Sequence, residues 1–165
     1  MKWTKSLLAA TLSLTLTACA EIDCPLQNIV ALRVGFYGAD GAQIQLPDTL
    51  SILAAGTDSV LFNRGVAITS VDIPVSYTRE ADTLLLRMAD AAGRVATDSL
   101  IFGHTNQVHF ENIDCPPAVF HSITSVRWTS HDPSALPMTV DSVVVASPNI
   151  NYDAQENLKV YIRTR

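Results

Sequence analysis

The chain has 165 residues, a formal net charge of −5 at pH 7 and 48% hydrophobic residues. An acidic chain is repelled by a phosphate backbone, so the charge balance argues against nucleic acid as a partner. The seven glycines are scattered and form no phosphate-binding loop, and the motifs Gly-x-Ser-x-Gly and His-Glu-x-x-His are absent from the sequence. We therefore expect a protein that is not an enzyme and holds no cofactor.

The N-terminus is organised as an export signal. Lys2 and Lys5 precede an apolar run over residues 7–16, and the tetrad Leu-Thr-Ala-Cys ends at Cys19. The run is half as long as the roughly 20 residues that span a bilayer as a helix. The tetrad resembles the lipobox, in which a small residue before the cysteine admits the signal peptidase and the free thiol accepts diacylglycerol. We predict a lipoprotein signal peptide at residues 1–18 and a lasting lipid anchor in the membrane on Cys19, the alternative being an ordinary signal peptide in which Cys19 is incidental.

The mature part is expected to be a single domain. Removing residues 1–18 from the 165-residue chain leaves 147, enough to bury one core of ordinary size. Residues 19–28 are then a lipidated tether, and residues 29–165 are the domain. Without Lys2 and Lys5, nine basic residues remain against sixteen acidic ones, so the mature chain has a formal charge of −7.

The three cysteines divide into one lipidation site and one pair. Once Cys19 carries lipid, Cys24 and Cys115 form an even pair in an exported chain, which predicts a disulfide between them. In the loop-entropy model, closing a loop of roughly 90 residues contributes about 4 to 5 kcal/mol. The alternative is two separate buried thiols. No Cys-x-x-Cys motif is present, which excludes a zinc ribbon and a thioredoxin-type redox motif.

Short segments with period-two alternation dominate the mature sequence, which is typical of strands with one buried face. Apolar residues from Val30 to Phe36 share one face of a first strand, and Asp40-Gly41 offers a turn into Ile44 and Leu46, which predicts a hairpin. Prolines fall between the segments or at their edges, where a missing N–H does least harm. We expect eight to ten strands, the later ones marked by Leu50 and Ile52, Val60 and Phe62, Val71 and Ile73, Val108 and Phe110, Phe120, Val126 and Trp128, and Leu158, Val160 and Ile162.

Residues 81–92 fit two patterns. Ala81, Leu84, Leu85 and Met88 also lie on one helical face. A strand over residues 83–89 is preferred, because residues 90–93 offer a turn and residues 95–102 an antiparallel return. The fold class that follows is all-β, an antiparallel β-sandwich of immunoglobulin-like or transthyretin-like type.

A tripeptide of Asp, then Ser or Thr, then an aliphatic residue occurs five times at irregular intervals. Asp and Ser near the start of a strand bond to nearby backbone groups and set turns. The alternative is that some of these carboxylates gather at one end of the sandwich and hold calcium. The five aspartates are Asp48, Asp58, Asp82, Asp98 and Asp141.

No metal site is expected from the four histidines, His104, His109, His121 and His131, since no two have the spacing that puts both on one face of a strand or helix. His109 and His121 lie opposite in phase to apolar neighbours and should point to solvent. Trp128 and Tyr152 are candidates for a sugar-stacking platform, although the phase of Trp128 with Phe120 and Val126 favours the core.

Several short motifs together resemble an uncharacterised Bacteroidota-type family of small β-sandwich lipoproteins. They are the lipobox, Cys24-Pro25, a first strand ending Phe36-Tyr37, the central Asp82-Thr83-Leu84, the late Cys115 and the closing strand at residues 158–162. Members commonly have a glycine after the late cysteine, where this chain has Pro116-Pro117. The family has no established activity, so the resemblance implies the fold, an envelope location and work beside outer-membrane proteins, and it implies no catalytic residue.

The sequence beside the anchor favours the outer membrane. Ala20 follows Cys19 where an aspartate would favour retention in the inner membrane. Glu21 and Asp23 give an acidic start that accompanies surface export in some lipoproteins, so a periplasmic and a surface-facing orientation both stay open. We expect a non-catalytic accessory or binding module that partners an envelope protein, for instance by accepting a strand at an open sheet edge. The alternatives are capture of a glycan or small ligand at the surface, and a small hydrolase.

Overall fold

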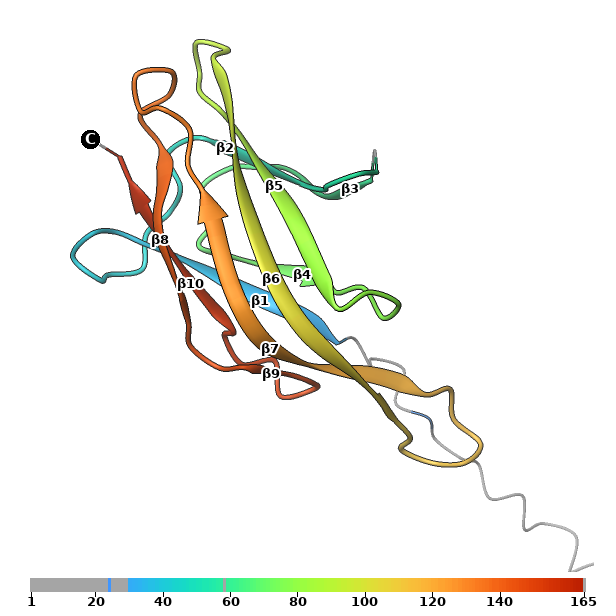
Figure 1. The fold of residues 1–165 in the computed structure, drawn as a ribbon. Helices are drawn as coiled ribbons and strands as arrows, with labels where there is room; N and C mark the ends of the chain where they lie inside the picture. Colours follow the sequence, from blue (N-terminus) through green and yellow to red (C-terminus); the bar gives the residue numbers. More distant parts are fainter. Residues whose placement is uncertain (1–23, 25–29, 58, 165) are drawn as a thin grey trace, which may run out of the picture.

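Strands are the only regular elements in the part of the chain that the structure describes. This computed structural model describes residues 24, 30–57 and 59–164, and its ribbon is shown in Figure 1. The strands are β1 (Ala31–Tyr37), β2 (Thr49–Ala54), β3 (Val60–Gly65), β4 (Ser70–Pro74), β5 (Ala81–Ala89), β6 (Val95–His109), β7 (Ala118–Thr129), β8 (Thr139–Val145), β9 (Asn149–Ile150) and β10 (Leu158–Arg163).

The strands form two sheets that enclose one hydrophobic core (Figure 1). One sheet has the order β4-β1-β10-β8, and the other has the order β3-β2-β5-β6-β7-β9. All neighbouring strands are antiparallel except β1 and β10, which run parallel with Val34 opposite Leu158. The prediction of an all-β sandwich with eight to ten strands is confirmed, and the parallel pair is its one departure from antiparallel pairing.

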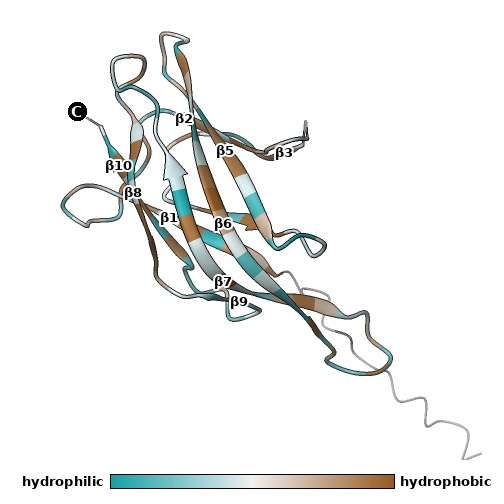
Figure 2. Cartoon of the chain, viewed as in Figure 1, coloured by the Kyte–Doolittle hydropathy of each residue, from teal (hydrophilic) through white to brown (hydrophobic). Residues whose placement is uncertain are grey.

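Alternate residues of the central strands point into the core. Leu84, Leu86 and Met88 of β5 and Leu100 and Phe102 of β6 are each at most 2% exposed. Figure 2 shows the resulting alternation of hydrophobic and hydrophilic bands along these strands. Burial at every second residue is the period of a strand, so the helical alternative for residues 81–92 is wrong.

The turn predicted at residues 90–93 is also confirmed. Gly93 has a φ of +80°, a conformation that glycine adopts without steric cost, and its N–H donates to the Asp90 carbonyl at 3.0 Å. The Asp90 side chain accepts from the Arg94 backbone N–H at 2.9 Å and from Arg94 Nε at 2.7 Å. The turn therefore sets the register in which β5 and β6 pair.

The hairpin predicted after the first strand is formed only in part. The turn is present, because Gly38 N–H donates to the Ala42 carbonyl at 2.9 Å and Gly41 has a φ of +80°. The return is a single bridge between Tyr37 and Gln43 instead of a strand. Leu46 is 2% exposed and leads the chain into β2 of the other sheet, so this segment is a crossover between the sheets.

β6 and β7 form the longest hairpin, with 15 and 12 residues (Figure 1). Their register shifts between Gly103 and His104, because Gly103 pairs with Ser125 and His104 with Ile123. Thr124 is therefore an extra residue, a β-bulge that reverses the inward and outward phase of β7. His121 is consequently 6% exposed, so the prediction that it points to solvent is wrong, and Phe120 lies on the opposite, outer side of the sheet.

The end of this hairpin leaves the core behind. Val108 is 57% and Phe110 63% exposed, although their alternation predicted a buried face. The cause is length, since β6 continues beyond the strands that cover its first half (Figure 1). Alternation predicts which side of a sheet a residue is on, and an opposing layer is needed to bury it.

Trp128, like Phe110, is more exposed than its position in the sequence pattern predicted. It pairs with the buried Leu100, so it is on the inner side of its sheet as predicted. Its side chain is nevertheless 37% exposed, and Nε1 donates to the Asp141 carbonyl of β8 at 3.2 Å. Trp128 closes the margin between β7 and β8 and is not a core residue.

Candidate functional site

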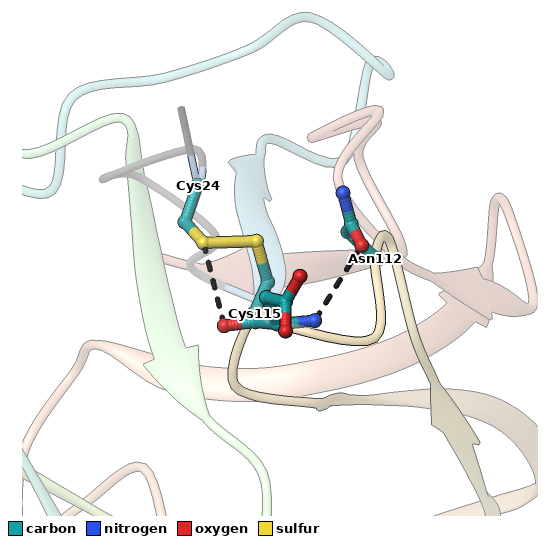
Figure 3. Close-up of a disulfide and its surroundings, with 4 residues drawn as sticks. Cys24, Asn112 and Cys115 are labelled. Atoms are coloured by element: carbon teal, nitrogen blue, oxygen red, sulfur yellow. Dashed lines mark hydrogen bonds between the residues drawn. A yellow bond between two sulfur atoms is a disulfide. The ribbon is translucent and has the colours of Figure 1, made fainter. Parts of the chain in front are cut away.

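A disulfide joins Cys24 to Cys115 in the loop between β6 and β7 (Figure 3). The two Cα atoms are 5.6 Å apart across 91 positions of sequence, which is the pairing that the cysteine count predicted. Cys19 and the signal peptide at residues 1–18 lie outside the described residues, as do all residues of the predicted tether except Cys24. The disulfide therefore attaches the segment that follows Cys19 to the far end of the β6–β7 hairpin.

A tight turn shapes the loop beside this disulfide. Cys115 N–H donates to the Asn112 carbonyl at 3.2 Å, and Asp114 N–H donates to Asn112 Oδ1 at 3.4 Å (Figure 3). Ile113, inside the turn, is 93% exposed. We name Val108, Phe110 and Ile113 the apolar tip, because these three exposed hydrophobic residues share the end of the hairpin.

The outer strands of the sheets differ in how well their edges are protected. An unprotected edge strand presents free backbone groups to other chains, and Pro, bulges or a short length normally prevent this. β4 ends at Pro74, β9 has two residues, and β3 pairs with β2 with register shifts. β8 also has a register shift, against β10 at Asp141, but it then ends in the uncharged run Ser-Val-Val-Val at residues 142–145, which pairs regularly with β10 and has Val144 49% and Val145 37% exposed.

The two ends of β8 are not equivalent. Its first half is covered from β7, because Trp128 donates to the Asp141 carbonyl and Ser130 Oγ donates to the Val140 carbonyl at 2.5 Å. The run at residues 142–145 lies beyond these two contacts, at the margin of its sheet. We name residues 142–145 the β8 edge.

A buried polar cluster connects β5, β6 and β7 and was not predicted. The Nδ1 atoms of His104 and His121 lie 2.8 and 2.7 Å from Asn106 Oδ1, and Asn106 Nδ2 donates to the Arg79 carbonyl at 2.7 Å. His104 Nε2 is 3.5 Å from Asp82 Oδ2 without hydrogen-bond alignment, and Asp82 Oδ2 accepts from Ser76 N–H at 2.8 Å. The Arg79 guanidinium is 3.0 Å from Asp82 Oδ1, at ion-pair distance without hydrogen-bond alignment.

Burial dominates the electrostatics of this cluster. It lowers the pKa of His121 to about 4, and the neighbouring His104 adds to the effect while Asp82 opposes it. His104 is 2% and Asp82 6% exposed, and no serine, threonine or cysteine side chain is among the hydrogen-bond partners of the two histidines. The geometry is that of a structural network in which each member holds its neighbour in place.

A second buried carboxylate ties three segments together. Asp98, with no exposed surface, accepts from the backbone N–H of His131 at 2.6 Å and of Val140 at 2.7 Å. His131 Nδ1 lies 2.6 Å from Asp98 Oδ1, and Thr139 Oγ1 donates to Oδ2 at 3.2 Å. Asp98 therefore fixes the connection between β7 and β8.

The five aspartates do not assemble into a calcium site within the described residues. Asp82 and Asp98 accept hydrogen bonds from backbone N–H groups, and Asp58 is not among the described residues. No group of three or more His, Cys, Asp or Glu side chains in the described ranges is arranged to hold a metal ion. Asp82 does bond to nearby backbone, at Ser76 N–H six positions away, whereas the backbone N–H groups that Asp98 accepts from are 33 and 42 positions away, so the prediction of a local turn is wrong for Asp98. Over the same ranges, no helix has the length and apolar character to cross a membrane.

The aromatic residues make a different surface from the predicted one. Tyr152 contacts Phe120 edge to face with ring centroids 4.9 Å apart, and His109 stacks on Phe120 at 4.2 Å. Trp128 lies eight residues further along β7 and contacts β8, so the structure does not bring Trp128 and Tyr152 together as a platform. A cavity of about 180 Å³ lies beside the Phe120 ring and is lined by Phe120, His121 and Asn151 among others.

The chain matches the model of one protein family, described as a family of unknown function, DUF6452, over residues 49–162. This range contains β2 to β9, most of β10 and Cys115, and it begins after β1 and Cys24. No curated protein and no solved structure matches the chain. Since the match covers well over half of the sequence, the chain belongs to the family of unknown function DUF6452.

Proposed function

We propose that this chain is an outer-membrane lipoprotein of the Bacteroidota type, anchored through Cys19, that acts as a non-catalytic partner of another envelope protein. The sequence supports the anchor through the lipobox and the short apolar run before it. The disulfide supports an envelope location, because such bonds persist in oxidising compartments. The partner is an envelope protein that offers an extended segment.

The β8 edge is the observation that carries this proposal. A segment that adds to a sheet edge gains main-chain hydrogen bonds, and exposed side chains beside the edge supply specificity. Among the outer strands of the described residues, β8 combines an uncharged run with exposed valines. Its own register shift against β10 comes before this run, so residues 142–145 pair regularly with β10 and contain no proline. Such an edge favours aggregation unless a partner covers it.

The test is recovery of a stoichiometric partner through this edge. The full-length chain with a C-terminal tag is expressed in the native cell, outer membranes are solubilised gently, and co-eluting proteins are identified. Val144→Lys places a charge on the β8 edge and should abolish recovery of the partner. Val60→Lys is the matched control, because Val60 is an edge valine of the same exposure class, 53% against 49%, on β3.

Different variants test the lipid anchor at Cys19 and the binding of a partner at the β8 edge. Cys19→Ala should move the chain to the soluble fraction and leave the affinity of the β8 edge intact in a binding assay with the purified partner. A partner that is recovered equally well with Val144→Lys does not use this edge, and recovery of no partner from either wild-type or Val60→Lys membranes contradicts the accessory function.

A second function, capture of a glycan, is favoured by one observation. Phe120 and the amide side chain of Asn151 both line a cavity of about 180 Å³, and the Phe120 ring also contacts the Tyr152 ring edge to face. Aromatic faces and amides are the groups that bind sugar rings. Binding to a glycan array that is lost in Phe120→Ala and kept in Val144→Lys supports this function over strand capture.

A further inference from the structure

We infer that the apolar tip docks on the lipid surface of the membrane that carries the anchor, so that the protein has two membrane contacts and a fixed orientation. The inference rests on the proposed lipid anchor at Cys19. It concerns Val108, Phe110 and Ile113, which are 57%, 63% and 93% exposed. These residues sit on the β6–β7 hairpin, beyond the strands that form the core (Figure 1).

Covalent geometry places the apolar tip near the bilayer. The disulfide holds Cys24 against Cys115, two positions from Ile113 and five from Phe110. Cys24 is five positions from Cys19, and a fully extended chain of that length spans at most about 18 Å. A diacylated Cys19 lies at the level of the lipid headgroups. The Cα atom of Cys115 is 5.6 Å from that of Cys24, so the disulfide keeps Cys115 within about 24 Å of that level, and the apolar tip begins two positions from Cys115.

The shape of the tip suits insertion into a headgroup layer. The turn that begins at Asn112 closes through the Cys115 N–H, and it projects Ile113 outward with almost all of its surface exposed. Phe110 precedes this turn and remains exposed although it is aromatic. An isolated soluble domain gains nothing by exposing three large hydrophobic residues at one end, whereas a membrane surface removes them from water.

The charges of the tip specify the kind of lipid. Residues 108–117 contain Glu111 and Asp114 and no lysine or arginine. The two carboxylates are repelled by anionic headgroups, and the apolar side chains do not require anionic lipid in order to insert. The preferred surface is therefore zwitterionic. This differs from basic peripheral proteins, whose binding depends on anionic lipid.

The experiment places a tryptophan at the tip of the lipidated full-length protein. Phe110→Trp is made in a Trp128→Phe background, the protein is purified from membranes, acylation of Cys19 is verified by mass spectrometry, and the protein is reconstituted into vesicles of phosphatidylcholine and phosphatidylethanolamine. With vesicles present, we expect the Phe110→Trp fluorescence to shift to shorter wavelength than that of the same protein in detergent-free buffer. Lipids brominated near the headgroup should quench this fluorescence. Anionic vesicles should give less quenching.

Val66→Trp in the same background is the control. Val66 is 68% exposed and follows β3, away from the hairpin end, so its tryptophan should be neither shifted nor quenched (Figure 1). If Trp128→Phe fails to fold, Phe110→Trp in the chain that keeps Trp128 gives the same readout as a difference from the parent protein.

Two negative outcomes have different meanings. An acylated protein whose Phe110→Trp emission is indifferent to brominated lipid overturns the docking of the tip and leaves the anchor intact. A protein without acyl chains on Cys19 overturns the anchor, and the inference about the tip falls with it.

Discussion

His104 and His121 direct their Nδ1 atoms at one acceptor, Asn106 Oδ1, at 2.8 and 2.7 Å. The rings meet edge to face with centroids 5.3 Å apart, and they come from different strands of the β6–β7 hairpin. Both are buried, so each ring needs a partner for its N–H. A single amide therefore satisfies two histidines at the point where the hairpin leaves the core.

The first prediction concerns this amide. Asn106→Ala removes the acceptor of two buried imidazoles and the donor to the Arg79 carbonyl, and each buried group left without a partner costs about 1 to 3 kcal/mol. We expect the free energy of unfolding to fall by about 2 to 4 kcal/mol. Urea unfolding followed by circular dichroism measures it. Gln107→Ala, at the exposed neighbouring position, should change stability little, and equal effects of the two substitutions would contradict the assigned role.

The second prediction is a loss of stability in mild acid. The pKa of His121 is lowered to about 4 from its ordinary value of 6.5, chiefly by burial, so the folded chain resists protonation that the unfolded chain accepts. Stability contributed by the neutral ring is complete above pH 6.5 and declines as the pH falls toward 4. The steepest slope that one group produces is about 1.4 kcal/mol per pH unit.

His121→Gln tests this assignment, since glutamine keeps an N–H near Asn106 and does not titrate. The unfolding free energy of the variant should vary less between pH 7 and pH 4 than that of the parent. His109→Gln is the control, because the His109 side chain is 38% exposed on the outer side of the hairpin. If the parent and His121→Gln lose stability in parallel, another group is responsible, Asp82 and His104 being the titratable neighbours.

The core strands could be predicted from the sequence, whereas the polar cluster could not. β5 and β6 keep strict alternation over residues 81–104 and pack against an opposing sheet along that whole length, so pattern and burial agree. The same pattern contained a signal that we did not use, because His104 is in phase with Leu100 and Phe102 and therefore points inward. The exposure of His121 was predicted wrongly for a different reason. No local sequence pattern indicates that Thr124 is a β-bulge that reverses the phase of β7.

Two further features depend on contacts between distant segments. The parallel pairing of β1 with β10 joins residues 34 and 158, and no local pattern specifies which strands become neighbours. The exposure of Phe110 follows from how far β6 extends past its neighbours, which is a property of the other strands as much as of its own. The cysteine pairing was predictable because, after one cysteine is assigned to lipid, a single pair is left.

The third prediction concerns the disulfide. Reduction of the Cys24–Cys115 bond releases a closure of 91 positions, which in the loop-entropy model lowers the free energy of unfolding by about 4 to 5 kcal/mol. Urea unfolding with and without dithiothreitol measures the loss. The double variant Cys24→Ser and Cys115→Ser should match the reduced protein and be insensitive to reductant, and a parent protein that is equally stable in both conditions would show that the closure has no effect on stability.

The fourth prediction tests Asp98 as the connection between the sheets. Its two carboxylate oxygens accept only from donors, namely the backbone N–H groups of His131 and Val140, the His131 ring and the Thr139 hydroxyl. Asp98→Asn turns one of these oxygens into an NH₂ group that faces an N–H, at a site without exposed surface. Breaking a buried charged hydrogen-bond network in this way costs about 3 kcal/mol or more.

Thr139→Val is the graded comparison, because it removes only the longest of these bonds, at 3.2 Å, and keeps the volume of the side chain. It should cost about 1 kcal/mol, the usual contribution of one hydrogen bond. Because Asp98 also holds the Val140 N–H at the start of β8, Asp98→Asn should in addition speed amide hydrogen exchange in β8 more than in β5. Uniform loss of protection across both strands would mean that Asp98 stabilises the sandwich as a whole and gives β8 no special support.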